Sequence, residues 1–362
     1  MTEVGLAKEQ LDTPVLWVDL NILERNIALL VEHFRRAGVN WRPHVKGVKV
    51  PELAHMLVDA GAIGVTCAKL GEAEVMAAAG ITDILVANQV VGPRKIERLV
   101  RLARTADIKV AVDNAENVNA LSQAATEQQV EIGVLVDVDT GMNRTGVQPG
   151  PAVVELARQV HAASGLRFLG LMAWEGHTLV HKETDVKHGA IVRAVELLTK
   201  MAADCEAAGL PVTIVSGGGS GTYKVTPFLP NMTEIQAGGA IFSDVAYSGW
   251  GVETTPCLFV RSIVTSRPAP DRMVFDAGYK ALPAWIAQPK PIGIDHIVKY
   301  STSAEHGVIT LSEPNLQIKV GDVFDFVVGY TDSTLFLHNQ LYGIRNDVVE
   351  NVWTVSARGM LT

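Results

Sequence analysis

The stretch KVAVDNAENVNALSQAATEQQVEIGVLVDVD, residues 109–139, contains the unit from which the fold is predicted. Its two ends, KVAVD and IGVLVDVD, are short continuous apolar runs rich in Val and Ile, as in strands buried on both faces of a parallel sheet. The segment between them repeats apolar residues at intervals of three and four, which predicts an amphipathic helix over 114–128. A strand, a helix and a second strand in this order predict a βαβ unit.

The same alternation extends along the chain to about residue 245. Helix-type periodicity recurs at 21–38, 50–61, 70–80, 92–105, 151–164 and 187–209. Apolar runs of strand length lie at 62–68, 83–91, 168–174, 212–218 and 234–238. So many consecutive units close more economically into a barrel than they extend into an open sheet. The sequence therefore predicts an α/β protein with a (β/α)8, TIM-type barrel over residues 23–255.

The pattern changes from residue 256 onward. Segments with period-two or β-branched character, separated by Pro, Gly and Asn, lie at 257–268, 272–278, 306–313, 323–330, 341–347 and 348–359. They predict a mostly antiparallel β domain over 256–362. The N-terminal segment 1–22 holds one more apolar run, TPVLWVDL, and the pattern leaves open whether this run joins the barrel or the β domain.

Composition limits the class of protein and its partners. Hydrophobic residues make up 48% of the chain and charged residues 19%, which favours a packed globular protein over a disordered one. The net charge of −8 gives no reason to expect nucleic acid or an acidic membrane as a partner. The start has no secretory pattern and no apolar run is long enough to span a bilayer, so we expect a cytoplasmic protein.

The cysteines carry no sign of a structural framework. Cys67, Cys205 and Cys257 are scattered without the spacing of a zinc site or a disulfide pattern. We expect them to be small buried hydrophobic side chains in a reducing compartment.

Polar residues and glycines follow the predicted barrel strands at their C-terminal ends, where barrel enzymes carry their chemistry. WRPHVKGVKV, residues 41–50, places Lys46 and Lys49 at the end of the first strand, although lysine is rarely fully buried. SGGGSG at 216–221 and AGG at 237–239 follow the last two strands, where barrels often bind phosphate. Glycine allows backbone N–H groups to approach a phosphate closely. A tight turn after the strand is the alternative explanation of SGGGSG.

The lysine and the glycine-rich loops would face each other across the barrel mouth. This arrangement suits a ligand with an aldehyde at one end and a phosphate at the other, as in pyridoxal phosphate. A lysine amine forms a Schiff base with that aldehyde, and desolvation lowers a lysine pKa so that the amine becomes nucleophilic. The sequence therefore predicts pyridoxal phosphate as the cofactor.

Four motifs carry a resemblance to a known family. They are RPHVKGVKVPELA at 42–54, VDVDTGMNRTGV at 136–147, SGGGSGTY at 216–223 and IQAGGAIFSD at 235–244. Together they resemble the D-threonine aldolase and D-serine dehydratase family, fold-type III pyridoxal phosphate enzymes related to alanine racemase. The resemblance runs through essentially the whole chain, and PHVK with the later SGGGSG is specific in combination.

The resemblance implies roles for individual residues. Lys46 matches the lysine that forms the Schiff base, and His44 matches the histidine of the same motif; Lys49 is then a supporting cation, with the Schiff-base role as its alternative. Arg144 matches the arginine that approaches the cofactor ring, with a surface salt bridge as its alternative. The phosphate loops are matched by Ser216, Gly217, Gly218, Gly219, Ser220, Gly238 and Gly239.

The chain departs from the family after the strand at 168–174. Trp174 and Glu175 stand where many relatives carry tyrosine and then histidine. A tryptophan can pack on the cofactor ring and donate one hydrogen bond, but it cannot accept one as a phenolic oxygen does. Trp174 is therefore expected to bind the cofactor and to tune its ring differently.

A second departure concerns a divalent ion. The resemblance implies a metal held by a histidine and, two residues on, by an aspartate or cysteine; here those positions are Tyr330 and Asp332. Asp332, with waters and the substrate, remains the candidate ligand for Mg2+ or Mn2+, whereas tyrosine is a poor ligand for such cations. His338 is a weaker candidate ligand. Whether a metal is bound stays open at this point.

The resemblance implies an aldolase that cleaves a D-3-hydroxy-α-amino acid, such as D-threonine, to glycine and an aldehyde. A dehydratase acting on D-serine or 3-hydroxyaspartate is the close alternative. A racemase is another, and it would need a second acid–base group such as Tyr279. A non-catalytic carrier of pyridoxal phosphate is disfavoured because such barrel-only proteins lack the β domain. We expect a homodimer with a small D-amino acid as its substrate.

Overall fold

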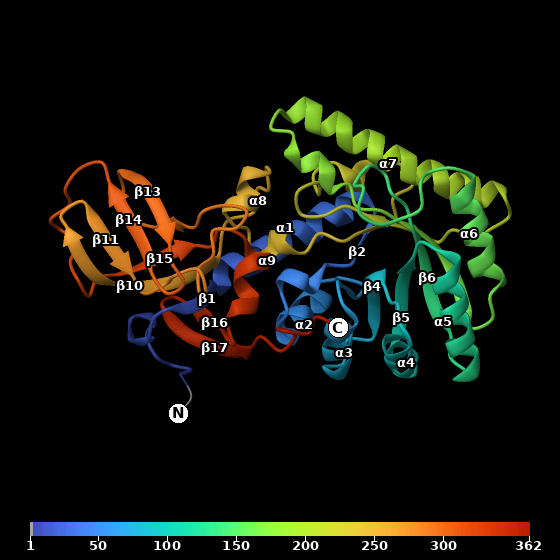
Figure 1. The fold of residues 1–362 in the computed structure, drawn as a ribbon, viewed down its shortest axis with the longest axis horizontal. Helices are drawn as coiled ribbons and strands as arrows, with labels where there is room; N and C mark the ends of the chain where they lie inside the picture. Colours follow the sequence, from blue (N-terminus) through green and yellow to red (C-terminus); the bar gives the residue numbers. More distant parts are fainter. Residues whose placement is uncertain (1–2) are drawn as a thin grey trace. The chain divides into compact units, whose positions relative to one another are not determined.

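The computed structural model describes residues 3–362 and divides into two compact units (Figure 1). The barrel unit comprises Leu30–Lys46, Pro51–Gly238 and Gly359–Thr362. The sheet unit comprises the chain up to Leu29, Gly47–Val50 and Gly239–Arg358. Within residues 3–362, every helix is too short or too polar to cross a lipid bilayer.

The barrel unit is built on one parallel sheet, which confirms the predicted fold class. Its strands are β2 (Asn40–Trp41), β3 (Val65–Cys67), β4 (Asp83–Gln89), β5 (Asp107–Val112), β6 (Ile132–Asp137), β7 (Leu166–Met172), β8 (Ile214–Gly217) and β9 (Glu234–Ile235). They pair in the order β2-β9-β8-β7-β6-β5-β4-β3. The backbone N–H of Ile63 donates to Trp41 O at 2.9 Å, and that of Thr66 donates to Pro43 O at 2.9 Å. These bonds join β2 to β3, so the eight strands close into a ring.

Helices follow the strands with the caps that their sequences predict. They are α1 (Leu20–Ala37), α2 (Pro51–Asp59), α3 (Leu70–Ala78), α4 (Pro93–Leu102), α5 (Ala115–Glu127), α6 (Pro151–Ala162) and α7 (Thr184–Ala207). Pro93 and Pro151 start α4 and α6, where a missing N–H removes no hydrogen bond. The Asn114 side chain accepts from Asn117 N and caps α5. Figure 1 shows α4, α5 and α6 beside β4, β5 and β6.

Charged side chains are buried at the ends of the barrel strands where β4, β5 and β9 begin. Arg42, 2% exposed, contacts both Asp83 and Glu234. Lys109, 4% exposed, contacts Asp83 and Asp107. Every charge in this network has an opposite partner, as burial requires.

The sheet unit contains nine strands. They are β1 (Val15–Asp19), β10 (Leu258–Ala269), β11 (Arg272–Phe275), β12 (Lys290–Pro291), β13 (Ile297–Thr302), β14 (Gly307–Leu311), β15 (Val323–Val327), β16 (Gln340–Arg345) and β17 (Val348–Thr354). The main path runs β13-β14-β11-β10-β1-β16-β17, and β15 pairs with β10 and β12. All strand pairs are antiparallel except β1 with β16. The apolar run at 13–20, whose sheet the sequence left open, lies here as β1.

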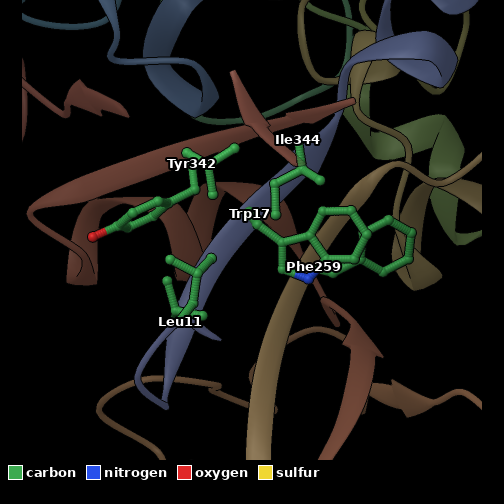
Figure 2. Close-up of a cluster of buried hydrophobic side chains, with 7 residues drawn as sticks. Leu11, Trp17, Phe259, Tyr342 and Ile344 are labelled. Carbon is green, nitrogen blue, oxygen red and sulfur yellow. The ribbon is translucent and has the colours of Figure 1, made fainter. Parts of the chain in front are cut away.

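A hydrophobic cluster holds β1 in this sheet (Figure 2). The rings of Trp17 and Phe259 stack with centroids 4.6 Å apart. Leu11, Tyr342 and Ile344 complete the labelled cluster. Trp17 Nε1 also donates to Asp325 Oδ1 at 2.9 Å, so its one polar atom has a partner.

The compact units differ from the predicted boundaries around residue 239. The sequence placed residues 239–255 with the barrel, but here they belong to the sheet unit. The chain after β9 forms the short helix α8 (Val245–Gly249). The backbone N–H groups of Val245 and Ala246 donate to Val328 O and Gly329 O. These bonds tie the segment to the sheet unit.

Candidate active site

Lys46 follows the first barrel strand within a turn of 3-10 helix, Val45–Gly47. The backbone of His44 forms a parallel bridge with Thr66, the middle residue of β3. Lys46 N donates to His44 Nδ1 at 3.4 Å, and both side chains are half-buried. Lys49, by contrast, is 8% exposed, has a φ of 55° and belongs to the sheet unit. The two lysines of one motif therefore stand in different environments.

The glycines after β8 and β9 pack too closely for any other residue. A Cβ on Gly219 would overlap the Trp174 ring, and a Cβ on Gly238 would overlap the His44 backbone. Gly218 has a φ of 69°, which favours glycine. Gly217 ends β8. Gly239, at the start of the sheet unit, similarly lies against the Tyr247 ring.

Trp174 lies against two glycines. The first is Gly219. The second is Gly176, where a Cβ would overlap the indole at Nε1. Trp174 follows β7, so its ring reaches from one strand end to the loop after the next strand. The indole thereby fixes the surface of the SGGGSG loop.

The two serines of that loop are buried. Ser216, fully buried, accepts a hydrogen bond on Oγ from Gln236 Nε2 at 2.9 Å. This bond fastens the loop after β8 to the residue that follows β9. Ser220 is 5% exposed.

The side chain of Glu175 is hydrogen-bonded to the same loop. The sequence did not identify it as a site residue. Its carboxylate, 2% exposed, accepts from Thr222 Oγ1 at 2.7 Å and from Thr226 Oγ1 at 2.6 Å. Its second oxygen accepts from Gly218 N at 3.3 Å. The signal in the sequence was the pair of threonines that follows SGGGSG. A buried carboxylate with three donors keeps the glycine loop in one conformation.

Replacing Glu175 with alanine is expected to weaken binding of pyridoxal phosphate by roughly 10- to 100-fold, because hydrogen bonds to a charged group contribute about 1.5–3 kcal/mol. Titrating the apoenzyme with the cofactor and following visible absorbance measures this change. Glu206→Gln, at an exposed position on α7, is the control and should leave the affinity unchanged. Equal affinity in Glu175→Ala and in the unmodified protein would show that the loop does not depend on this carboxylate.

Arg144 is exposed on a loop that neighbouring carboxylates anchor. Asp137 accepts from Thr145 Oγ1 at 2.8 Å, and Asp113 accepts from Gly146 N at 3.1 Å. Burial raises the pKa of Asp137 above its usual value. The residues directly after Arg144 are therefore fixed to the ends of β5 and β6.

His177, which follows β7, is a further candidate to which the sequence assigned no role. Its Nδ1 is buried and has no hydrogen-bond partner among residues 3–362. A Cβ on Gly141 would lie 2.9 Å from its Nε2, so the ring packs on the loop that carries Arg144. Thr140 Oγ1, in the same loop, is also buried without a partner within the described chain. Such atoms are uncommon in proteins, and a water or a polar group of a ligand would supply the missing partner.

Asp332 lies in the sheet unit, at the second position of α9 (Thr331–Thr334). Tyr330 Oη donates to Asp332 Oδ2 at 3.0 Å. Asp332 also packs against the Cα of Gly47. A cavity of about 250 Å³ opens beside it, lined by Tyr279, Pro283, Trp285, Asp332, Ser333, Phe336 and Leu337.

Two family models match the chain. The model of the alanine racemase N-terminal domain matches residues 18–245, and a serine dehydratase domain matches residues 257–344. A D-threonine aldolase of Arthrobacter sp. is 36% identical over 97% of this chain and 93% of its own length. A 3-hydroxy-D-aspartate aldolase of Paracoccus denitrificans is 37% identical over 98% and 94%. The solved D-threonine aldolase of Filomicrobium marinum superposes with a TM-score of 0.96, at 34% identity over the full length of both chains.

The closed parallel barrel, the antiparallel sheet and the lysine after the first strand define an enzyme of the alanine racemase class. Within that class, the chain belongs to the D-threonine aldolase and D-serine dehydratase family of fold-type III pyridoxal phosphate enzymes.

Proposed function

We propose that this protein is a pyridoxal phosphate-dependent lyase that cleaves a D-3-hydroxy-α-amino acid to glycine and an aldehyde. The observation that carries the proposal is the similarity to two aldolases at 36% and 37% identity over nearly the whole chain. The residues of the barrel mouth fit that activity, because Lys46, the glycine loop after β8 and the half-buried His177 follow strands of one barrel.

The glycine loops and Lys46 are assigned to the cofactor. Their close packing leaves backbone, rather than side chains, at the surface of the loop, as a phosphate requires. The backbone of Gly217, Gly218, Gly219, Gly238 and Gly239, with Ser216 and Ser220, would hold the phosphate. Lys46 would bind the aldehyde carbon through its amine, with His44 beside it. Trp174 and Arg144 would contact the cofactor ring.

His177 is assigned to the substrate hydroxyl. When bound, the cofactor withdraws electrons from the Cα of the amino acid that it holds. His177 takes the proton of the β-hydroxyl as the Cα–Cβ bond breaks, which releases the β-carbon as an aldehyde. Lys46, freed from the cofactor by the substrate amine, returns a proton to Cα and yields glycine.

Dehydration is the second candidate function. The serine dehydratase domain model matches residues 257–344, which include Asp332. In a dehydratase the Cα–H bond breaks and the β-hydroxyl leaves as water, so the same residues would serve with a proton moved to the hydroxyl rather than from it. A racemase would use Tyr279, which is 50% exposed in the sheet unit.

Product analysis separates these functions. The holoenzyme is incubated with D-threonine, D-serine and D-3-hydroxyaspartate, with and without Mn2+. Glycine with an aldehyde supports the proposal. A 2-oxo acid with ammonia would assign the protein as a dehydratase, appearance of the L-isomer would assign it as a racemase, and no turnover with a bound cofactor would revive the carrier alternative.

We also propose that the protein is a cytoplasmic homodimer. Three buried free cysteines suit a reducing compartment. Large apolar side chains exposed on the sheet unit, among them Trp285 at 64% and Phe336 at 40%, suit contact with a second copy. Light scattering on the purified protein measures the mass; a monomer at micromolar concentration would contradict the dimer.

A further inference from the structure

We propose that this enzyme works without a divalent ion, because the Tyr330–Asp332 pair takes up the position at which relatives would bind one. The activity test of this inference rests on the proposed aldolase function. A measurement of metal binding tests it without that function.

The first donor, Tyr330, is unsuited to a cation. Its hydroxyl donates a hydrogen bond to Asp332 Oδ2 at 3.0 Å, so the proton lies between the two oxygens that would otherwise face a cation. Divalent ions bind anionic oxygen or neutral imidazole far better than a neutral phenol. The hydrogen bond also occupies one oxygen of the carboxylate.

Aromatic rings enclose the pair. The Tyr330 ring lies 5.7 Å from Tyr247, 5.8 Å from Trp250 and 6.1 Å from Trp285, between ring centroids. The hydroxyls of Tyr247 and Tyr330 are also hydrogen-bonded to each other. Tyr247 is itself buried, with 5% exposure. These rings keep Tyr330 in place.

The other acidic and imidazole groups nearby are engaged elsewhere. Asp244, fully buried, accepts from Tyr247 N at 2.7 Å and from the N and Oγ1 of Thr331 at 2.7 and 2.8 Å. Burial raises the pKa of Asp244 to about 7. His338 Nε2 is hydrogen-bonded to Ala281 O at 2.7 Å. Across residues 3–362, no group of three or more His, Cys, Asp or Glu side chains is arranged to hold a metal.

The donor set therefore does not fit Mg2+ or Mn2+, which take about six oxygen or nitrogen ligands. A phenol hydrogen-bonded to a carboxylate stands instead where the ion would need two ligands. Cleavage would then depend on proton transfer by His177 rather than on polarisation of the substrate hydroxyl by an ion.

Metal content and metal affinity test this inference on the holoenzyme. After dialysis against EDTA and then metal-free buffer, elemental mass spectrometry should find far less than one divalent ion per chain. Calorimetric titration with Mn2+ should show no site, and the rate of D-threonine cleavage should not change with EDTA or with Mn2+. Stoichiometric Mn2+ binding, or activity lost with EDTA and restored by Mn2+, would overturn the inference.

A gain-of-binding variant gives the positive control. Tyr330→His restores the imidazole that the family carries at this position, and the variant should bind one Mn2+ per chain by calorimetry. Tyr330→His combined with Asp332→Asn should lose that site. Tyr330→Phe, which removes only the hydroxyl, should bind no Mn2+. Binding in Tyr330→Phe equal to that in Tyr330→His would show that the phenol had blocked a complete site, and would contradict the proposed lack of ligands.

These readouts separate the inference from the proposed function. If the protein cleaves no D-3-hydroxy amino acid under any condition, the proposed function fails. The calorimetric comparison of the unmodified protein with Tyr330→His still decides whether the chain is built to hold an ion.

Discussion

Replacing Lys46 with alanine is expected to remove the visible absorbance band of the bound cofactor and to lower turnover by on the order of 10⁴-fold or more, the scale seen when a residue that acts covalently is deleted. The physical reason is that the amine of Lys46 forms the only covalent link that we assign to the cofactor. Without this amine, pyridoxal phosphate would be held by its phosphate and ring contacts alone. Absorbance spectra of the purified variant, recorded with added cofactor, measure the first effect, and product formation from D-threonine measures the second.

Lys49→Ala is the matched control for this prediction. Lys49 lies three residues further on, with 8% exposure and a left-handed φ of 55°. Its loss is expected to lower the melting temperature but to leave the visible band in place. A band that persists in Lys46→Ala and disappears in Lys49→Ala would exchange the roles of the two lysines.

The barrel was predictable because seven of its eight strands, all but β2, contain a continuous apolar run of local sequence. The run at 132–139 became β6, which is buried at all six positions, as a continuous apolar run requires in a strand covered on both faces. The helix predicted over 114–128 became α5, Ala115–Glu127, between an asparagine cap and a polar end. Period and capping depend on near neighbours, so a single sequence contains them.

The assignment of β1 needed information that is not local. Val15–Asp19 is apolar enough for either sheet, and its place was decided by partners far along the chain, such as Phe259 and Ile344. Pairing with strands more than two hundred residues away leaves no periodic trace in the segment itself. The place of residues 239–255 also depends on distant partners, because bonds from Val245 and Ala246 to residues 328 and 329 join that segment to the sheet unit.

The residues of the candidate site also differ in whether local sequence could predict them. Lys46 and the glycine loops were recognisable by residue type and by position after strands. Glu175 and His177 were not, because their importance comes from hydroxyls, an amide and a loop that the fold brings to them. Tyr330 is the opposite case. The sequence alone identified it as a tyrosine in place of the family histidine, and the structure adds its hydrogen bond to Asp332.

His177→Phe is expected to lower the turnover of D-threonine cleavage by about 10²- to 10⁴-fold, the usual contribution of a general base. Phenylalanine is close to imidazole in shape, so the ring should still pack on Gly141 while the proton acceptor is lost. Cofactor binding should remain close to that of the unmodified protein, because the residues assigned to the phosphate and to the aldehyde are unchanged. Steady-state kinetics, with a spectrum of the bound cofactor for each variant, measure both quantities.

Two comparisons make the His177 result specific. His188→Phe, at an exposed position on α7, should leave turnover unchanged, which excludes a general effect of replacing histidine. His177→Gln keeps a hydrogen-bonding group but cannot take a proton near neutral pH, so it should be nearly as slow as His177→Phe. A His177→Gln variant with full activity would mean that the side chain only positions the substrate hydroxyl. The base would then have to be another group at the barrel mouth, and Lys46, freed when substrate binds the cofactor, is the one that the assignment leaves available.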